Sequence, residues 1–215
     1  MKVVYVSWSK AVEMCYRLAE KILESNEEFD SLVAVSRGGL IPARIVSDAL
    51  NLDRVYVIRS KFWGVGGTIA DKPLIEVHEK IDVRGGKVLV IDEVVDTGLT
   101  LKNICKLLGK MGASTVKTGV LHYKSRSVFK PDYYVEYVRD WVWIFYPWSL
   151  SETLYSLAIA RRDGESFNET VKDILKNLNV EVPFKDFNML INSIKKYYGS
   201  EKKTVKRECE EIVRG

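Results

Sequence analysis

The sequence predicts an α/β fold, a parallel sheet flanked by helices, followed by a helical C-terminal region. Two observations lead to this fold class. Up to about Trp148, short apolar and β-branched runs alternate with helical patterns, and the runs are nearly continuous in apolar residues, as in strands buried on both faces. After Trp148 only helical patterns remain. We therefore expect a sheet domain over residues 1–148 and a C-terminal helical subdomain, a small bundle, over residues 149–215.

Each element is predicted from its own pattern. Six apolar runs are the candidate strands: Val3–Val6, Leu32–Ser36, Arg54–Ile58, Lys87–Ile91, Thr115–Leu121 and Tyr133–Val138. Three intervening segments repeat apolar residues at helical spacing: Ser9–Ser25, Leu40–Leu50 and Thr100–Met111. This alternation predicts parallel pairing, with ligands bound in loops at the carboxyl ends of the strands. The C-terminal helices are expected at Ser149–Arg161, Ser166–Leu178, Phe184–Tyr198 and Ser200–Val213.

The composition excludes several classes of protein. Of the 215 residues, 47% are hydrophobic and 29% are charged, which excludes a disordered chain. No apolar run approaches the roughly 18 residues of a membrane span, and the chain enters a strand-like run without an export signal, so we expect a cytoplasmic protein with no membrane partner. Three distant cysteines fit neither a disulfide framework nor a C-x-x-C metal site. A net charge of +4 with scattered cations favours anionic ligands but no nucleic-acid partner.

The segment 87–101 contains a candidate phosphate site. An apolar run leads to Asp92 and Glu93 and then to Thr97-Gly98-Leu99-Thr100, which we call the threonine loop, at the predicted start of a helix. The first N–H groups of a helix have no partners within it, so together with two threonine hydroxyls they suit a phosphate. Gly98 lets the backbone approach that phosphate closely.

Asp92 and Glu93 suit a different ligand. Carboxylates do not bind phosphate directly, but they accept hydrogen bonds from sugar hydroxyls and can hold hydrated Mg²⁺. A phosphate cradle beside two acids therefore indicates a phosphorylated ribose. A second cradle is predicted at Ser36-Arg37-Gly38-Gly39, the arginine loop, where a permanent cation and two glycines follow another strand. Together the two loops predict a sugar that carries an anionic group at each end.

These strings carry a resemblance to a known family. The string Lys87–Leu101 resembles the phosphoribosyl-diphosphate (PRPP) motif of the type I phosphoribosyltransferases, and Val33–Pro42 is similar to the diphosphate loop of their xanthine-guanine and related 6-oxopurine members. The similarity runs from Tyr5 to Trp148. It implies a type I phosphoribosyltransferase core with a base-binding hood over residues 1–148, which transfers 5-phosphoribosyl from PRPP to a purine base. The implied products are diphosphate and a nucleoside 5′-monophosphate, with Mg²⁺ bound mainly through PRPP and no certain protein ligand.

The resemblance also implies roles for individual residues. Asp96 matches the catalytic carboxylate that handles the proton near purine N7. The residues that match the phosphoribosyl site are Asp92, Glu93, Thr97, Gly98, Leu99 and Thr100. Those that match the diphosphate site are Ser36, Arg37, Gly38 and Lys61, and the glycine-rich segment Ser60–Lys72 matches the family's mobile lid. Those that match the base site are Lys124, Trp143 and Ile144.

The resemblance gives two indications of the base. Lys124 matches the lysine that donates to O6 of guanine, xanthine or hypoxanthine, whereas adenine presents a donor amino group at that position. The helical C-terminal third departs from the bacterial 6-oxopurine pattern, and the whole chain looks like an archaeal branch of adenine phosphoribosyltransferases. We expect adenine, giving AMP in purine salvage, with a 6-oxopurine as the alternative. Members of the family commonly pair, so a homodimer is expected.

A protein of another class remains as an alternative, a PRPP-sensing regulator that keeps the fold without catalysis. Such a regulator usually carries a DNA-binding helical module, which here would have to be the C-terminal helices. The cations of residues 195–207 are interleaved with glutamates, as on a solvated helix face. The presence of Asp96 and of the arginine loop also favours an enzyme.

Overall fold

The computed structural model describes residues 2–61, 63–64, 67–68, 73–140, 142–160, 166–180 and 187–197. They group into two compact units. The first holds residue 2 and residues 6–143, and the second holds residues 3–5 together with the described residues from 144 onward. The predicted division at residue 148 stays a prediction.

The first unit is built on a six-stranded sheet with the order β6-β3-β2-β7-β8-β9. All neighbours pair in parallel except β6, which runs antiparallel to β3 at one edge. The strands are β2 (Ser31–Ser36), β3 (Val55–Lys61), β6 (Leu74–Glu76), β7 (Lys87–Val95), β8 (Thr115–Lys124) and β9 (Tyr133–Val138). The expected α/β fold class with a parallel sheet is thereby confirmed.

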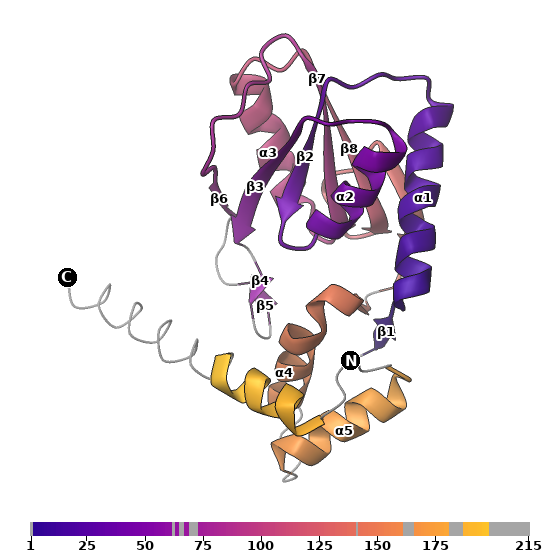
Figure 1. The fold of residues 1–215 in the computed structure, drawn as a ribbon, viewed down its shortest axis with the longest axis vertical. Coiled ribbons are helices and arrows are strands. Elements are labelled where there is room, and N and C mark those ends of the chain that lie inside the picture. The colour runs from indigo at the N-terminus through magenta and orange to yellow at the C-terminus, as the bar shows by residue number, and fades with distance from the viewer. Residues whose placement is uncertain are drawn as a thin grey trace, which may run out of the picture. The chain divides into compact units, whose positions relative to one another are not determined.

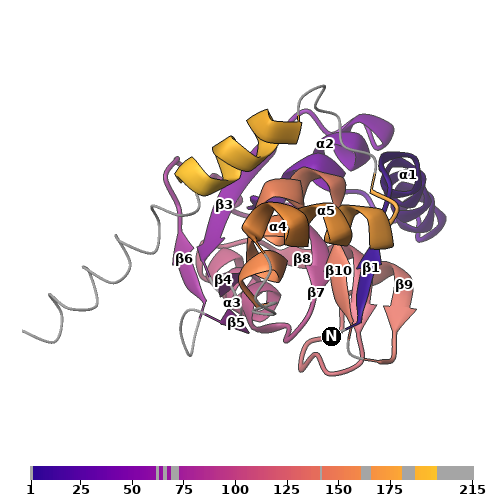
Figure 2. The same cartoon turned by 90° about the horizontal axis from the view of Figure 1, so that it is seen from below.

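Helices cover both faces of this sheet (Figures 1 and 2). α1 (Trp8–Glu24) and α2 (Leu40–Ala49) lie on one face, and α3 (Leu99–Lys110) lies on the other. The buried residues of α1 recur at helical spacing: Ala11, Met14, Cys15, Leu18, Ala19 and Ile22. Because these residues bury one stripe of the helix, the spacing seen in the sequence orients α1 on the sheet.

The centre of the core lies at β2 and β7. Residues 32–35 of β2 and 88–91 of β7 are almost fully buried, as expected for strands covered by helices on both faces. On the α3 side, Leu101, Ile104 and Leu108 pack with the valines of these strands. The two central strands are therefore fixed by contacts on both faces and by neighbours on both edges.

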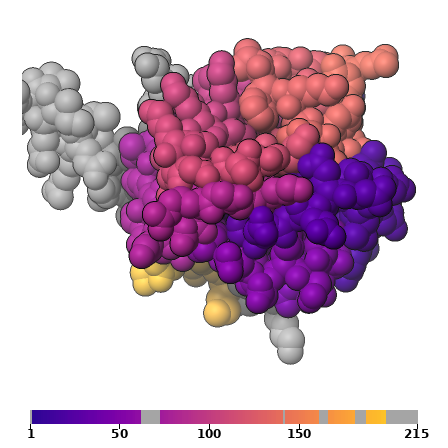
Figure 3. All heavy atoms as spheres, turned by 90° about the horizontal axis from the view of Figure 1, so that it is seen from above, coloured from indigo at the N-terminus to yellow at the C-terminus, as the bar shows by residue number. Residues whose placement is uncertain are grey.

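The chain winds outward from these two strands in opposite directions. From β2 it passes through α2 to β3, and from β7 it passes through α3 to β8. The carboxyl ends of β2 and β7 are therefore the point where the direction of winding reverses, which is where ligands bind in open α/β sheets. The opposite end of the strands carries the loops that lead into them, onto which Figure 3 looks.

The structure differs from the expectation at several strands: β3 continues to Lys61, beyond its predicted end at Ile58, and β6 and β10 were not predicted. The run expected as Val3–Val6 forms β1 (Val3–Tyr5), which pairs with β10 (Trp143–Phe145) in a separate two-stranded sheet, and its residue Val4 is 41% exposed. β7 and β8 each extend three to four residues beyond the predicted ends, because parallel pairing continues as far as Val95 and Tyr123. Asp92 and Glu93 therefore lie inside β7 and not after it.

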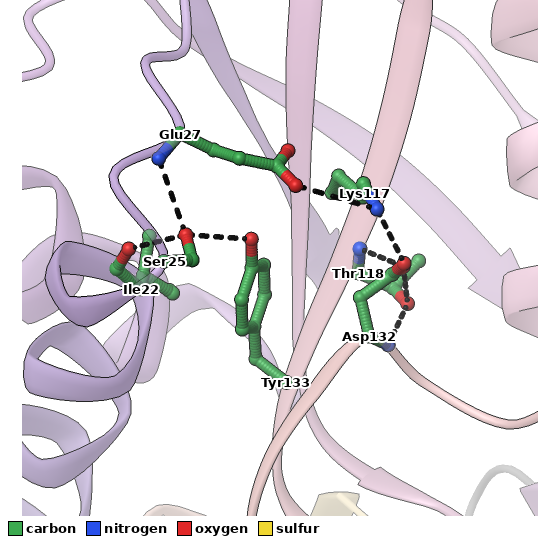
Figure 4. A network of polar contacts seen from close by, with 7 residues as sticks. All are labelled: Ile22, Ser25, Glu27, Lys117, Thr118, Asp132 and Tyr133. Carbon is green, nitrogen blue, oxygen red and sulfur yellow. Dashed lines mark hydrogen bonds and ion pairs between the residues drawn. The ribbon is translucent and has the colours of Figure 1, made fainter.

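A polar network anchors the edge strand β9 (Figure 4). Asp132 Oδ2 accepts hydrogen bonds from the backbone N and Oγ1 of Thr118, both at 2.9 Å, and Asp132 Oδ1 lies 3.2 Å from Lys117 Nζ. The Asp132 hydrogen bond and charge are the main causes that raise the pKa of Lys117. Tyr133 Oη lies 3.0 Å from Ser25 Oγ at the end of α1. The network fixes β9 against β8 and α1.

The second unit is mainly helical. Its elements are β1, part of β10, a 3₁₀ turn (Pro147–Ser149), α4 (Leu150–Ala160), α5 (Phe167–Asn177) and a helix over residues 187–197. The expected helix Ser200–Val213 lies outside the described residues. Within the described part of the chain, no helix combines the length and the apolar character that crossing a membrane requires.

Candidate active site

The two predicted anion loops meet at the carboxyl ends of β2 and β7. A Cβ on Gly38 would lie 2.5 Å from Glu93 Cδ, and a Cβ on Gly39 would lie 2.5 Å from the carbonyl oxygen of Ile91 and 3.0 Å from Asp92 Cα. The two contacts at 2.5 Å are closer than real Cβ atoms show, so glycine at both positions lets the arginine loop lie directly against the end of β7. The site is thus assembled by two glycines that the sequence places in adjacent positions.

The arginine loop turns from β2 into α2 within four residues. The Gly39 N–H donates to the Val35 carbonyl at 2.8 Å, and the Leu40 N–H donates to the Arg37 carbonyl at 3.2 Å. The Ser36–Arg37 peptide is cis. The turn places the Arg37 guanidinium at the carboxyl end of a central strand, where it can pair with an anion.

Asp92 and Glu93 form an adjacent pair of acids in the last part of β7. The Glu93 N–H donates to Asp92 Oδ1 at 2.8 Å. Burial, and secondly the charge of Glu93, raise the pKa of Asp92 well above its ordinary value. A ligand that donates hydrogen bonds, such as a sugar diol, or a cation would relieve this repulsion. Among the described residues no group of three or more His, Cys, Asp or Glu side chains is arranged to hold a metal.

The threonine loop connects β7 to α3. Gly98 is the N-cap of α3 and has a φ of 82°, a left-handed conformation that glycine adopts without strain. Glycine has no side chain to cap the helix, and the Thr97 hydroxyl accepts from the Leu99 N–H at 3.4 Å. The first turn of α3 therefore presents N–H groups and the hydroxyls of Thr97 and Thr100 to a ligand, a suitable site for a phosphate.

Two other segments hold the threonine loop in place. The turn after β8 lies over it, because a Cβ on Gly98 would lie 2.7 Å from Phe129 Cβ and the Val128 N–H donates to the Thr97 carbonyl at 3.0 Å. On the other side, Ser60 Oγ of β3 lies 3.3 Å from Thr100 Oγ1. The loop is thus fixed before any ligand binds, which lowers the entropic cost of binding.

Asp96 is held by two cations. Its Oδ2 accepts from Lys124 Nζ at 2.9 Å, and its Oδ1 accepts from Arg126 Nε. The exposed fractions of the side chains are 13% for Asp96, 7% for Lys124 and 42% for Arg126. The structure therefore brings the predicted proton-handling residue and the predicted base-binding lysine together in one buried ion pair.

The remaining predicted residues, Lys61, Trp143 and Ile144, lie on β3 and β10. Lys61 ends β3 with an exposed side chain. Of the glycine-rich segment after it, the structure describes the short strands β4 (Trp63–Gly64) and β5 (Gly67–Thr68), and the rest of the predicted lid lies outside the described residues. Trp143 is half-buried, and its indole Nε1 has no hydrogen-bond partner among the described residues. Ile144 belongs to the second unit.

Comparison with protein families identifies this architecture. The model of the phosphoribosyl transferase domain matches residues 5–153, which include both anion loops and the Asp96 cluster. The chain belongs to the phosphoribosyltransferase family. The expectation of an enzyme of this family is thereby confirmed.

Similar proteins agree with the predicted type of core. A xanthine-guanine phosphoribosyltransferase of Idiomarina loihiensis is 31% identical over 147 residues, which cover 68% of this chain and 86% of that protein. A second, from Chromohalobacter salexigens, is 29% identical over 149 residues, 67% of this chain and 83% of that protein. The crystal structure of a purine phosphoribosyltransferase from Pyrococcus horikoshii has 34% identity and a TM-score of 0.59, covering 69% of this chain and 95% of that one. The resemblance to type I phosphoribosyltransferases with a 6-oxopurine-like core is confirmed.

Two polar residues of the site were not assigned by sequence reasoning. Ser60 was predicted only as the first residue of the lid segment, and Arg126 was given no role of its own. Arg126 follows Lys124 by two positions, and this spacing of two cations at a strand end was the available signal. Its partner is 30 positions away in the sequence, so the contact appears only in the folded chain.

Proposed function

We propose that the protein is a purine phosphoribosyltransferase that transfers 5-phosphoribosyl from PRPP to a 6-oxopurine. The observation that carries the proposal is the Lys124–Asp96 pair beside the threonine loop. In this proposal, Lys124 would supply a donor for an exocyclic oxygen and Asp96 an acceptor for a ring N–H, next to the proposed phosphate site. The xanthine-guanine relatives support the same class of base.

The two anion loops would bind the two ends of PRPP. The threonine loop would hold the 5′-phosphate through the first turn of α3 and the hydroxyls of Thr97 and Thr100. The arginine loop would hold the diphosphate through Arg37 and the backbone of Gly38. Asp92 and Glu93, between the loops, would accept hydrogen bonds from the ribose 2′- and 3′-hydroxyls.

Mg²⁺ fits this arrangement as a partner of PRPP. Carboxylate oxygens are the protein ligands that Mg²⁺ prefers, and the last part of β7 carries two carboxylates, Asp92 and Glu93. PRPP and water would supply most of the coordination. When bound, the ion would neutralise charge on the leaving diphosphate. Asp92 and Glu93 would orient the ribose that carries it.

The chemistry requires a nucleophilic base, a leaving group and a place for one proton. The bond from ribose C1 to diphosphate oxygen breaks as a bond from C1 to a purine nitrogen forms, and the sugar gains positive charge in between. Arg37 would stabilise the diphosphate charge. Asp96 would accept the hydrogen bond of the purine N7–H and take up the proton that the base loses.

Lys124 would select the base. A lysine ammonium is a donor only, so it favours O6 of guanine, xanthine or hypoxanthine and opposes the amino group of adenine. Because Lys124 is buried, binding adenine would be unfavourable: the Nζ hydrogen that faces the amino group would have neither an acceptor on the base nor a water molecule.

Adenine is the second candidate, and one observation favours it. The curated relatives cover 67% and 68% of this chain, and the described helices α5 and 187–197 lie beyond residues 5–153. The expectation of adenine was based on this helical extension. The similarity to xanthine-guanine phosphoribosyltransferases does not cover the extension, so it gives no information about the base there.

One assay separates these functions. Diphosphate release is measured with PRPP and Mg²⁺ and, in turn, guanine, xanthine, hypoxanthine and adenine. We expect release with at least one 6-oxopurine at a kcat/KM well above that for adenine. Release with adenine alone would reverse the assignment of the base. Binding of PRPP without diphosphate release with any base would identify a PRPP sensor instead.

A further inference from the structure

We infer that Arg126 is a positioning residue for the transfer reaction, which holds the Asp96 carboxylate so that Lys124 is available to the base. The inference rests on the proposed function, because it concerns the residue proposed to take up the proton. It assigns a role to a side chain outside the sets of residues predicted from the sequence.

The geometry starts from the position of Asp96. β7 ends at Val95, and its last pair with β8 is Val95 opposite Tyr123. Asp96 is therefore the first residue beyond the ladder, next to Lys124 at the end of β8. No regular backbone pairing continues at Asp96, so the direction of its carboxylate depends on the side chains that contact its two oxygens.

Those oxygens are divided between two cations. Lys124 Nζ contacts Oδ2 and Arg126 Nε contacts Oδ1. The cluster has one negative and two positive charges, a net charge of +1. Such a net charge suits a purine that develops negative charge as it loses its proton.

The turn that carries Arg126 is itself firmly held. The Ser127 N–H donates to the Lys124 carbonyl at 3.1 Å, and the Ser125 N–H donates to the Val138 carbonyl at 2.9 Å. The Ser125 hydroxyl also donates to the Arg139 carbonyl at 2.6 Å. Because both sides of the turn are bonded to β8 and β9, the guanidinium approaches Asp96 from a fixed backbone.

The two cations are not equivalent. Lys124 has a flexible stem and three hydrogens on Nζ, and the proposed function requires one of them to be directed to the base. Arg126 has a planar, permanently charged group whose Nε–H is fixed in direction. Arg126 therefore keeps the Asp96 carboxylate in position when Lys124 turns towards the base.

Kinetics of single and double variants test the inference. Arg126→Ala should lower kcat by about 10-fold to 10²-fold, because a small misplacement of a reacting group has an effect of that size. The KM for PRPP, and the affinity for PRPP measured by calorimetry with Mg²⁺, should change by less than about threefold. Arg126→Lys should recover part of kcat, because it restores a cation near Oδ1 without the fixed Nε–H.

A double variant tests whether Arg126 acts through Asp96. Asp96→Asn alone should lower kcat by about 10²-fold or more. If Arg126 acts by positioning Asp96, adding Arg126→Ala to Asp96→Asn should lower kcat by less than about twofold further. Arg84→Ala is the matched control, because Arg84 Nε also faces an aspartate, Asp82 Oδ1 at 3.5 Å, on an exposed surface. It should leave both kcat and KM unchanged.

Three results would overturn the inference. The first is a kcat for Arg126→Ala equal to that of the wild type. The second is a loss of PRPP affinity comparable to the loss of kcat, since Arg126 would then contact the substrate itself. The third is a kcat of the double variant that lies below that of Asp96→Asn by the full factor measured for Arg126→Ala alone. An inactive wild-type protein would instead contradict the proposed function. Circular dichroism melting curves identify a variant that does not fold, and in that case Arg126→Gln, which keeps most of the side-chain volume, replaces it.

Discussion

Glu93 occupies the space that a side chain at position 38 would need, with its Cδ 2.5 Å from where a Gly38 Cβ would lie. The loop after β2 and the acids of β7 are therefore fitted to each other directly. A larger side chain at position 38 would therefore have to displace the Glu93 carboxylate directly.

Gly38→Ala should displace Glu93 and weaken PRPP binding while leaving the sheet intact. Calorimetry with PRPP and Mg²⁺ should show a Kd raised by about tenfold or more, since a shift of this carboxylate disturbs both loops. Gly109→Ala is the control, because Gly109 lies in α3 with open space around its Cβ position, and it should stabilise the fold by about 0.5–1 kcal/mol. Wild-type PRPP affinity in Gly38→Ala would show that the loops work independently.

Thr100→Val should weaken the binding of PRPP and of the nucleoside monophosphate product by similar factors, about tenfold, because both carry the 5′-phosphate. Thr100→Ser keeps the hydroxyl 3.3 Å from Ser60 and should bind like the wild type. Calorimetry with each ligand measures the two constants. Equal affinities for Thr100→Val and the wild type would place the phosphate elsewhere.

Lys124→Ala should abolish the preference for a 6-oxopurine over adenine. It removes the donor for O6 and leaves Asp96 with Arg126, so kcat/KM for guanine or hypoxanthine should fall by about 10²-fold and that for adenine should stay within about threefold. Diphosphate release with each base measures the ratio. A parallel loss for all bases would indicate that Lys124 serves only to hold Asp96.

His122 should make the folded state sensitive to acid. Burial in β8 lowers the pKa of His122 from 6.5 to about 4, although Glu136 at 3.4 Å opposes this shift. Between these two pH values the unfolded chain binds a proton that the folded chain does not. The free energy of unfolding therefore falls as the pH falls from 6.5 to 4, by up to about 1.4 kcal/mol per pH unit.

Replacing the histidine should flatten that dependence. Urea unfolding of His122→Gln at several pH values should show a smaller decrease between pH 6.5 and 4 than the wild type. His78→Gln is the control, because the side chain of His78 is 71% exposed. Identical slopes for the wild type and His122→Gln would assign the acid sensitivity to other groups.

The sequence predicted what depends on local pattern. Strand β9 was predicted at its observed bounds, Tyr133–Val138, and the helices within one or two residues, because hydrophobic spacing is a local property. The end of β7 was placed too early because Asp92 and Glu93 resemble the polar residues that end a strand. The structure shows that the ladder with β8 continues through them.

The site was predicted less evenly. The two loops were predicted from the types and spacing of their residues, and the structure places both at the carboxyl ends of central strands, whereas their role in binding anions stays a prediction. The Asp96–Arg126 contact depends on the register of β7 on β8, which no local pattern encodes. The strand Val3–Val6 was misplaced for the same reason, since an apolar run does not identify its partner.

The two anion loops follow the central strands of the sheet, whereas Lys124 and Arg126 follow an outer part of it, near the edge strand β9. In the proposed function, the residues that bind the sugar phosphate thus follow the best-packed strands, and the residues that recognise the base lie nearer the edge of the sheet. Such a division would allow the preference for a base to change through substitutions in the turn after β8, while the residues that bind the activated sugar stay the same.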